Sequence, residues 1–194
     1  MTCTDLSEIL RKHWLWLGQE DNGERANLED ANLDGADMRF AKMQRANMKG
    51  ATMQGATMQG AHMRYADMRF ANMQGADMQG ADMRCSNMTY ANMQDANMQD
   101  TDLKNVSMRF ADMRGADIDY SCWPLQCGSL KAHVDDRIAI QLLYHALSVV
   151  QHSPYVSDDI KRTLLTEAVV DIANRFHRVE ECGELEIFNG GKEA

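Results

Sequence analysis

The feature that most constrains the fold is a five-residue repeat that runs without interruption from residue 26 to residue 120. Fifteen of the 16 methionines fall at the centre of a unit, and alanine stands two residues before the centre in 16 of the 19 units. The four centres that are not methionine are Leu28, Leu33, Leu103 and Ile118. A fixed internal period of this kind indicates a repeat architecture.

A period of five fits neither of the ordinary secondary structures. A helix places apolar residues about 3.6 positions apart, and a half-buried strand alternates them. The period does fit a chain that turns a corner every five residues, so that four units make a square coil of 20 residues. Successive coils would stack about 4.8 Å apart through backbone hydrogen bonds. We therefore expect the alanine and methionine side chains to fill the interior, where unbranched methionine adapts to irregular gaps.

The units, typically Ala-(Asn/Asp)-Met-(Gln/Arg)-(Gly/aromatic), resemble those of the pentapeptide-repeat family, whose consensus is A(D/N)LXX. This resemblance implies an all-β repeat solenoid: a right-handed quadrilateral β-helix of just under five coils. The chain departs from the family in having methionine instead of leucine or phenylalanine at nearly every centre. Several members of the family resemble double-stranded DNA in shape and charge and act on DNA gyrase.

The segments on either side of the repeat predict helical caps, because an exposed coil end would leave backbone groups unpaired. The predicted domains are an N-terminal capping helix and connection over residues 1–25, the β-helix over 26–120 and a C-terminal helical cap over 121–194. The N-terminal helix spans 4–17, with apolar residues at helical spacing. These residues are Leu6, Ile9, Leu10, Trp14 and Leu17.

Two further helices are predicted in the C-terminal cap, one from about residue 135 to 151 and one that begins after Ser157. The first has its apolar face on Ile138, Leu142, Leu143, Leu147 and Val150. The second would bury Ile160, Leu164, Val169, Ile172 and Phe176. Members of the family often dimerise through C-terminal helices, so the resemblance implies a homodimer.

Stacking of residues 20 apart sorts the charges by face. The two adjoining faces that begin at Leu33 and Met38, here called the acidic half, carry eight aspartates against two arginines. These aspartates are Asp34, Asp37, Asp77, Asp95, Asp100, Asp112, Asp117 and Asp119. The other two faces, here called the basic half, carry eight cations against five carboxylates. Candidate binding residues on the basic half are Arg64, Arg69, Phe70, Tyr90, Arg109 and Phe110.

Three interpretations of this surface stay open. The acidic half could imitate the phosphate backbone of DNA and occupy a basic groove on a partner protein. The basic half could instead contact nucleic acid through stacking and phosphate contacts; the net charge of −9 opposes this, so we do not expect direct nucleic-acid binding. Alternatively, the charges only solvate the surface, and the aromatic side chains shield its edge or dock the cap.

The first interpretation predicts a non-enzymatic protein-binding module that competes with DNA for a DNA-binding enzyme or complex. Family resemblance suggests a gyrase-type topoisomerase as the target. The C-terminal segment resembles the helical modules of pentapeptide proteins on phages, which implies a CRISPR or other defence complex as the target of an anti-CRISPR inhibitor. The alternative is a structural or scaffolding protein with no DNA-related target.

Catalysis is not expected, because a convex coil offers no dry pocket that could shift the pKa of an acid or base. Zinc could bind Cys122, Cys127, His177 and Cys182, since it takes thiolates and imidazole tetrahedrally; otherwise these are buried thiols and a histidine at a helix end. No other cofactor is expected. No stretch approaches the roughly 20 apolar residues of a membrane span, and no secretion signal is readable at the N-terminus. We therefore expect a cytoplasmic protein with reduced thiols.

Overall fold

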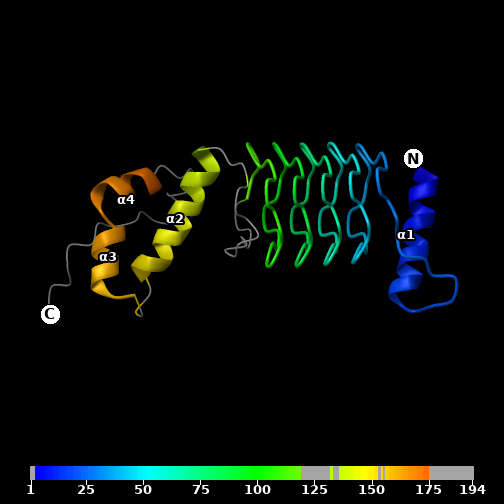
Figure 1. Ribbon diagram of the computed structural model, residues 1–194, viewed down its shortest axis with the longest axis horizontal. Coiled ribbons are helices and arrows are strands. Elements are labelled where there is room, and N and C mark those ends of the chain that lie inside the picture. The colour runs from blue at the N-terminus through cyan, green and yellow to red at the C-terminus, as the bar shows by residue number, and fades with distance from the viewer. Residues whose placement is uncertain (1–2, 119–131, 133–135, 153, 155, 175–194) are drawn as a thin grey trace. The chain divides into compact units, whose positions relative to one another are not determined.

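The computed structural model describes residues 3–118, 132, 136–152, 154 and 156–174 (Figure 1). The chain divides into two compact units, residues 1–134 and residues 135–194. The first unit contains helix α1 and the repeat, and the second contains helices α2, α3 and α4. Among the described helices, none combines the length and the apolar character that crossing a bilayer requires.

The repeat winds into stacked coils, which Figure 1 shows side by side along one axis. The second residue of a unit forms a parallel bridge with the residue 20 positions later, from the pair Asn27–Asn47 to the pair Asn97–Asp117. The predicted coil of four units is therefore confirmed.

The coils contain isolated bridges and, within the described residues, no strands. This differs from the all-β description expected from the sequence. A strand needs several consecutive paired residues, but here the chain turns a corner after each pairing. The hydrogen bonds of a parallel sheet are present, yet each face of the coil is too short to extend them along the chain.

Every backbone N–H group of a typical unit has an acceptor. In the unit 71–75, four of the five N–H groups donate to backbone carbonyl oxygens at N···O distances of 2.7–3.1 Å. Two of these acceptors lie in the following coil, one in the preceding coil and one in the preceding unit. The fifth donor, the N–H of Gln74, binds the side-chain Oδ1 of Asn72 at 3.3 Å. The backbone N–H groups of such a unit are thereby satisfied, as a stable interior requires.

This fifth hydrogen bond explains why the second position of the unit is usually Asn or Asp. In thirteen units the side-chain Oδ1 of that residue accepts the N–H of the residue two positions later. Asn and Asp favour this local turn because the side chain is short and carries an acceptor at the right distance. The sequence showed the preference, but only the structure shows that it holds the corner.

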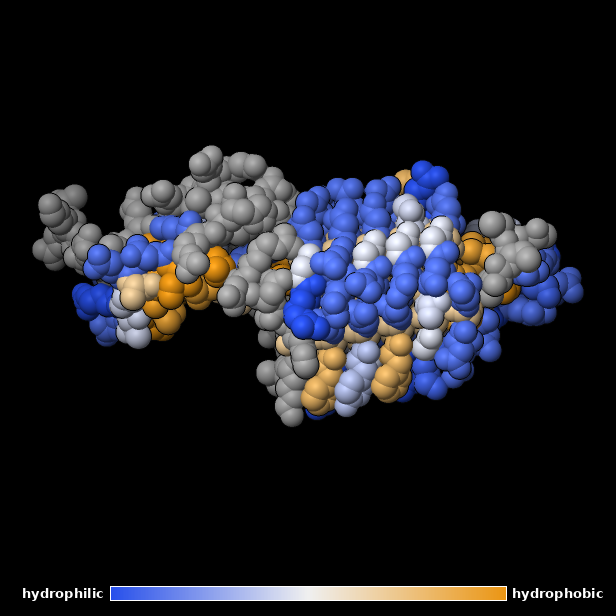
Figure 2. All heavy atoms as spheres, turned by 90° about the horizontal axis from the view of Figure 1, so that it is seen from above, coloured by the Kyte–Doolittle hydropathy of each residue, from blue (hydrophilic) through white to orange (hydrophobic). Residues whose placement is uncertain are grey.

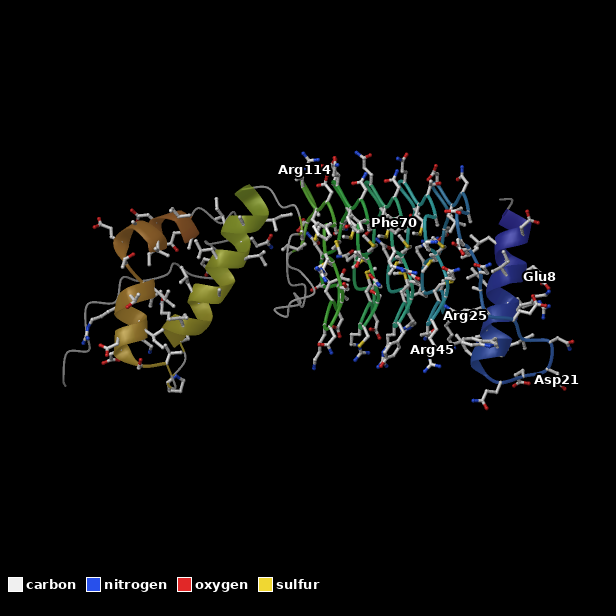
Figure 3. All side chains as sticks on the ribbon, viewed as in Figure 1. Glu8, Asp21, Arg25, Arg45, Phe70 and Arg114 are labelled. Atoms are coloured by element: carbon white, nitrogen blue, oxygen red, sulfur yellow. The ribbon has the colours of Figure 1, made fainter. Side chains whose placement is uncertain are left out.

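The interior is filled as predicted. The methionine side chains from Met48 to Met113 are at most 1% exposed, and the alanines that precede them from Ala46 onward are equally buried. Thr101, which replaces one of these alanines, donates its hydroxyl to the backbone oxygen of Met78 at 3.0 Å. The sulfur atoms lie within the coils in Figure 3.

Helix α1 (Cys3–Leu17) lies at the first coil, as expected for an N-terminal cap. Leu6 is 7% exposed and His13 is fully buried. The Nδ1 atom of His13 accepts the backbone N–H of Ala26 at 2.9 Å, so this side chain satisfies the first donor of the repeat. The prediction that Trp14 packs inward is wrong, because this side chain is 52% exposed. His13, one position earlier on the helix, takes the buried place.

His13 makes the cap sensitive to pH. Burial lowers the pKa of His13, the backbone of Gln44 opposes this by hydrogen bonding, and the charge of Arg25 lowers the pKa further. As the pH falls, the unfolded chain therefore binds the proton first. The stability that neutral His13 contributes is complete above its ordinary pKa of 6.5 and is lost as the pH falls toward the lower folded value. Protonation of Nδ1 would also remove the acceptor of Ala26.

The expected result is a lower unfolding midpoint in urea as the pH falls from about 7.5 to about 5.5, a range in which most carboxylates stay ionised. The variant His13→Ala should be less stable at the higher pH by about 1–3 kcal/mol, because the Ala26 N–H becomes a buried orphan. The pH dependence should be weaker in this variant. An equal pH dependence in both proteins would contradict the assignment to His13.

In the second unit, α2 (Asp136–His152) matches the predicted helix to within one residue at each end. The predicted second helix is wrong in two respects. It is broken into α3 (Asp158–Leu164) and α4 (Glu167–Ala173), and three residues expected to be buried are 40–50% exposed. These residues are Ile160, Leu164 and Ile172. Phe176 lies outside the described residues.

The break has a local cause. Leu165 leaves the helical conformation at φ −95° and ψ 50°, and Thr166 is extended at φ −80° and ψ 156°. Leu165 instead joins a cluster with Tyr144 and Leu147 of α2 and Val170 of α4. Burial of this leucine favours an interrupted helix, which helical periodicity alone does not reveal.

Candidate functional site

The acidic half forms as the map predicted, but two of its aspartates are neutralised. Asp37 binds Arg39 and Asp112 binds Arg114, each with an Oδ2···Nη2 distance of 2.6 Å. Hydrogen bonds from Arg39 lower the pKa of Asp37 to about 2, and those from Arg114 lower the pKa of Asp112 to about 2. Because each pair has no net charge, it contributes little to the negative potential of the acidic half.

Two other carboxylates of the acidic half accept hydrogen bonds from neutral side-chain amides. Asp77 accepts the side-chain amides of Gln59 at 2.6 Å and Asn97 at 3.0 Å, and Asp117 accepts that of Gln99 at 2.8 Å. Amide donors orient a carboxylate without neutralising its charge. No described cation forms an ion pair with four of the predicted residues: Asp34, Asp77, Asp95 and Asp100. Asp119 lies outside the described residues.

Most carboxylates of the basic half form ion pairs with arginine or lysine. Asp67 pairs with Arg69 at 2.7 Å, and Arg84 contacts both Asp82 and Asp102. Glu29 binds Lys49 at 2.9 Å. Four of the five carboxylates on this half are therefore in ion pairs, whereas four carboxylates of the acidic half, Asp34, Asp77, Asp95 and Asp100, have no cationic partner among the described residues. Unneutralised negative charge is concentrated on the acidic half.

The predicted aromatic ladder is present along one edge of the basic half. The ring centroids of Phe70 and Tyr90 are 5.2 Å apart, those of Tyr90 and Phe110 are 4.8 Å apart, and the planes are within 7° of parallel. Arg109 lies over the Phe110 ring at 5.9 Å. Figure 2 shows apolar side chains gathered along an edge of the coils, beside an otherwise hydrophilic surface.

The ladder occupies backbone positions that suit glycine better. The last residue of each described unit, from Asp30 to Gly115, has a φ between 54° and 75°. Seven of these 18 residues are glycine, but Phe70, Tyr90 and Phe110 adopt the same left-handed conformation. Each such residue costs roughly 1–2 kcal/mol, while a stacked pair returns about 0.5–1.5 kcal/mol. Two stacks offset only part of the strain of three rings, so stability alone does not account for the ladder.

The described residues contain a surface depression near the end of α1 but no cluster of potential metal ligands. No group of three histidine, cysteine, aspartate or glutamate side chains among them could hold a metal ion. A depression of about 410 Å³ beside the end of α1 is lined by Trp14, Leu17, Gly18, Glu20, Lys42 and Gln44. The predicted zinc ligands Cys122, Cys127, His177 and Cys182 all lie outside the described residues, so this site stays a prediction.

Comparison with known proteins identifies the repeat. A family model for pentapeptide repeats, present in eight copies, matches residues 24–60, 53–89 and 81–119. The chain belongs to the pentapeptide-repeat family. Membership implies a right-handed β-helix, and pentapeptide-repeat proteins are generally structural or binding proteins, not enzymes. No curated protein matches the chain in sequence.

Several solved pentapeptide-repeat structures are similar to this chain. One, from the thylakoid lumen of Arabidopsis thaliana, is 24% identical over 60% of this chain and 75% of its own, with a TM-score of 0.49. Another, from Nostoc, is 21% identical over 69% of this chain and 96% of its own, with a TM-score of 0.37. QnrB1, a plasmid-mediated fluoroquinolone resistance protein, is 14% identical over 64% and 71%, with a TM-score of 0.39.

Proposed function

We propose that this pentapeptide-repeat protein is a non-enzymatic binding module whose acidic half competes with DNA for a nucleic-acid enzyme or complex. The observation that supports this is the uneven neutralisation of carboxylates. Asp34, Asp77, Asp95 and Asp100 share two adjoining faces and lack a described cation partner, while most carboxylates on the basic half are paired. A basic groove would recognise the first surface and not the second.

The spacing of these charges supports a local resemblance to DNA. The two coil spacings that begin at Asp77, about 10 Å of axis, carry Asp77, Asp95 and Asp100 without a described cation partner. The same length of duplex DNA carries about six charges. The negative charge at this end of the β-helix is thus sparser than that of DNA but of the same order. A gyrase-type topoisomerase, or a CRISPR or other defence complex inhibited in the manner of a phage anti-CRISPR protein, is the proposed target.

The experiment compares two triple variants with the same change in net charge. Asp77→Asn, Asp95→Asn and Asp100→Asn remove charge from the acidic half while keeping the side-chain oxygen that accepts N–H groups. Asp67→Asn, Asp82→Asn and Asp102→Asn do the same on the basic half. Each full-length protein is immobilised and used to capture partners from a bacterial lysate, with and without competing duplex DNA.

The first triple is expected to weaken capture about tenfold or more, which corresponds to about 1.4 kcal/mol, and the second to leave it near the wild-type level. Duplex DNA should release the captured protein. A partner that resists duplex DNA and is equally captured by both variants would support the alternative, a scaffolding protein with no DNA-related target. A homodimer and a cytoplasmic location stay predictions.

A further inference from the structure

An arginine at the fourth position of a unit usually pairs with an aspartate at the second position, but Arg64 and Arg109 have no aspartate there. Arg39, Arg69, Arg84 and Arg114 each bind the aspartate two residues earlier in the same unit, at Nη2···Oδ2 distances of 2.6–2.7 Å. Arg64 has His62 at that position. The unit therefore keeps the arginine but not the carboxylate that elsewhere neutralises it.

A tyrosine and two further arginines lie close to Arg64 or to one another along the same edge. Its Cζ atom lies 5.7 Å from the centroid of the Tyr65 ring, and the Cζ of Arg45, one coil earlier, lies 5.9 Å from the same centroid. Arg25, a further 20 positions earlier, donates its Nε–H to the backbone oxygen of Arg45 at 2.5 Å. Figure 3 shows Arg25 and Arg45 near each other at one edge of the first coils. These four residues, Arg25, Arg45, Arg64 and Tyr65, are here called the arginine corner.

No ion pair among the described residues neutralises the arginine corner. Of the nearby carboxylates, Glu29 binds Lys49 and Asp82 in the following coil binds Arg84. Hydrogen bonding from Arg84 and, to a smaller extent, the charge of Arg64 lower the pKa of Asp82, but within the described part of the chain Arg64 forms no ion pair with it. Two further basic side chains, Lys42 and His62, occupy the same face and are exposed. Three guanidinium groups thus gather on one edge with a tyrosine that is 53% exposed.

The like charges of these guanidinium groups repel one another. The ring of Tyr65 offsets part of this repulsion through cation–π attraction, which at exposed sites is about 0.5–1 kcal/mol per contact. An anion would offset far more of it. Guanidinium groups match a phosphate geometrically, because each can donate two parallel N–H groups to its oxygens. Tyr65 adds a hydroxyl donor, and like the ladder residues it holds a left-handed conformation at φ 60°, which glycine would adopt at less cost.

We propose that the arginine corner binds a phosphate group of a ligand. This site is separate from the acidic half and does not depend on the proposed competition with DNA. The net charge of −9 does not prevent binding, since at physiological ionic strength charges more than about 8 Å away are largely screened. The phosphate could belong to a small molecule or to a nucleic-acid strand, which share this chemistry.

Two variants of equal net charge test the proposal. Arg45→Asn with Arg64→Gln removes two of the three guanidinium groups of the arginine corner. Asparagine tolerates the left-handed conformation at position 45. Glutamine suits position 64 because Gln44 occupies the equivalent position one coil earlier. Arg39→Gln with Arg114→Gln is the control on the acidic half, where Gln59 and Gln94 occupy the same columns. Binding of inorganic pyrophosphate and of a short single-stranded thymidine oligonucleotide is measured by calorimetry on each full-length protein.

The corner variant is expected to lose about tenfold or more in affinity, since a hydrogen bond between charged groups is lost at each arginine. The control should keep wild-type affinity. If pyrophosphate shows this pattern and the oligonucleotide binds no tighter, the site takes a small phosphate; tighter binding of the oligonucleotide assigns it to a strand. The proposal is overturned if neither probe binds the wild type, or if both variants change affinity equally.

Discussion

Deletion of Gln74 alone is expected to unfold the β-helix from that point onward, whereas deletion of the entire coil 61–80 is expected to leave a shorter β-helix. Loss of one residue moves every later residue by one position, so that asparagine and aspartate enter the interior and methionine is exposed. Nine centres from Met78 to Ile118 would leave the core. Burial of each large apolar side chain contributes about 1.5–3 kcal/mol, so the loss of nine, about 14–27 kcal/mol, equals or exceeds the roughly 5–15 kcal/mol that stabilises a typical domain.

Deletion of 61–80 behaves differently because the coil repeats every 20 residues. Ala81 then follows Gly60 in the place that Ala61 held, and each backbone donor finds the same kind of acceptor. Circular dichroism and urea unfolding measure both proteins. A third protein that lacks residues 71–75 serves as a control: it keeps the interior but rotates all later charges by one face. Cooperative unfolding of the Gln74 deletion at the wild-type midpoint would contradict the stacked-coil account.

Replacement of Met78 by alanine is expected to lower the free energy of unfolding by about 2–5 kcal/mol. Met78 is 0% exposed and lies near the middle of the stack. The loss combines the transfer of the side chain with the cavity that it leaves, because the neighbouring coils are held at a fixed spacing by backbone hydrogen bonds and cannot collapse inward. Urea denaturation followed by circular dichroism measures the change.

The matched control is Met78→Leu, which conserves volume and should cost less than about 1.5 kcal/mol. The backbone oxygen of Met78 accepts the Thr101 hydroxyl in both variants, so this hydrogen bond does not separate them. A loss below about 1 kcal/mol for Met78→Ala would show that the flexible methionines of neighbouring units repack into the space.

The aromatic ladder and the ion pairs of the β-helix show which surface features the sequence predicts and which it does not. Stacking of residues 20 apart placed Phe70, Tyr90 and Phe110 in one ladder, and the structure confirms it. The same map counted Asp37 with the exposed acids, although Arg39 neutralises it. A face assignment follows from periodicity, but an ion pair depends on the orientation of two side chains. The spacing of aspartate two residues before arginine was the signal that could have revealed it.

The helices outside the repeat show what helical spacing does not predict. Helical spacing predicted α1 and α2, but it chose Trp14 over His13 for burial and joined α3 to α4. Hydropathy ranks tryptophan as the better core residue, yet the first coil presents an unpaired N–H at Ala26 that needs an acceptor. The requirement arises on another segment of the chain, so no local pattern in residues 3–17 contains it.

The sequence by itself determined the square coil, the identity of the core and the face on which each repeat residue lies, because a period of five constrains every unit in the same way. Only the tertiary structure decided which charges are neutralised, which side chain closes the first coil and where the C-terminal helix breaks. Those outcomes depend on contacts between single residues that occur once in the chain. The coil, the core and the faces can be predicted because they repeat in every unit. The ion pairs, the buried side chain at the first coil and the helix break do not repeat, so they depend on three-dimensional packing.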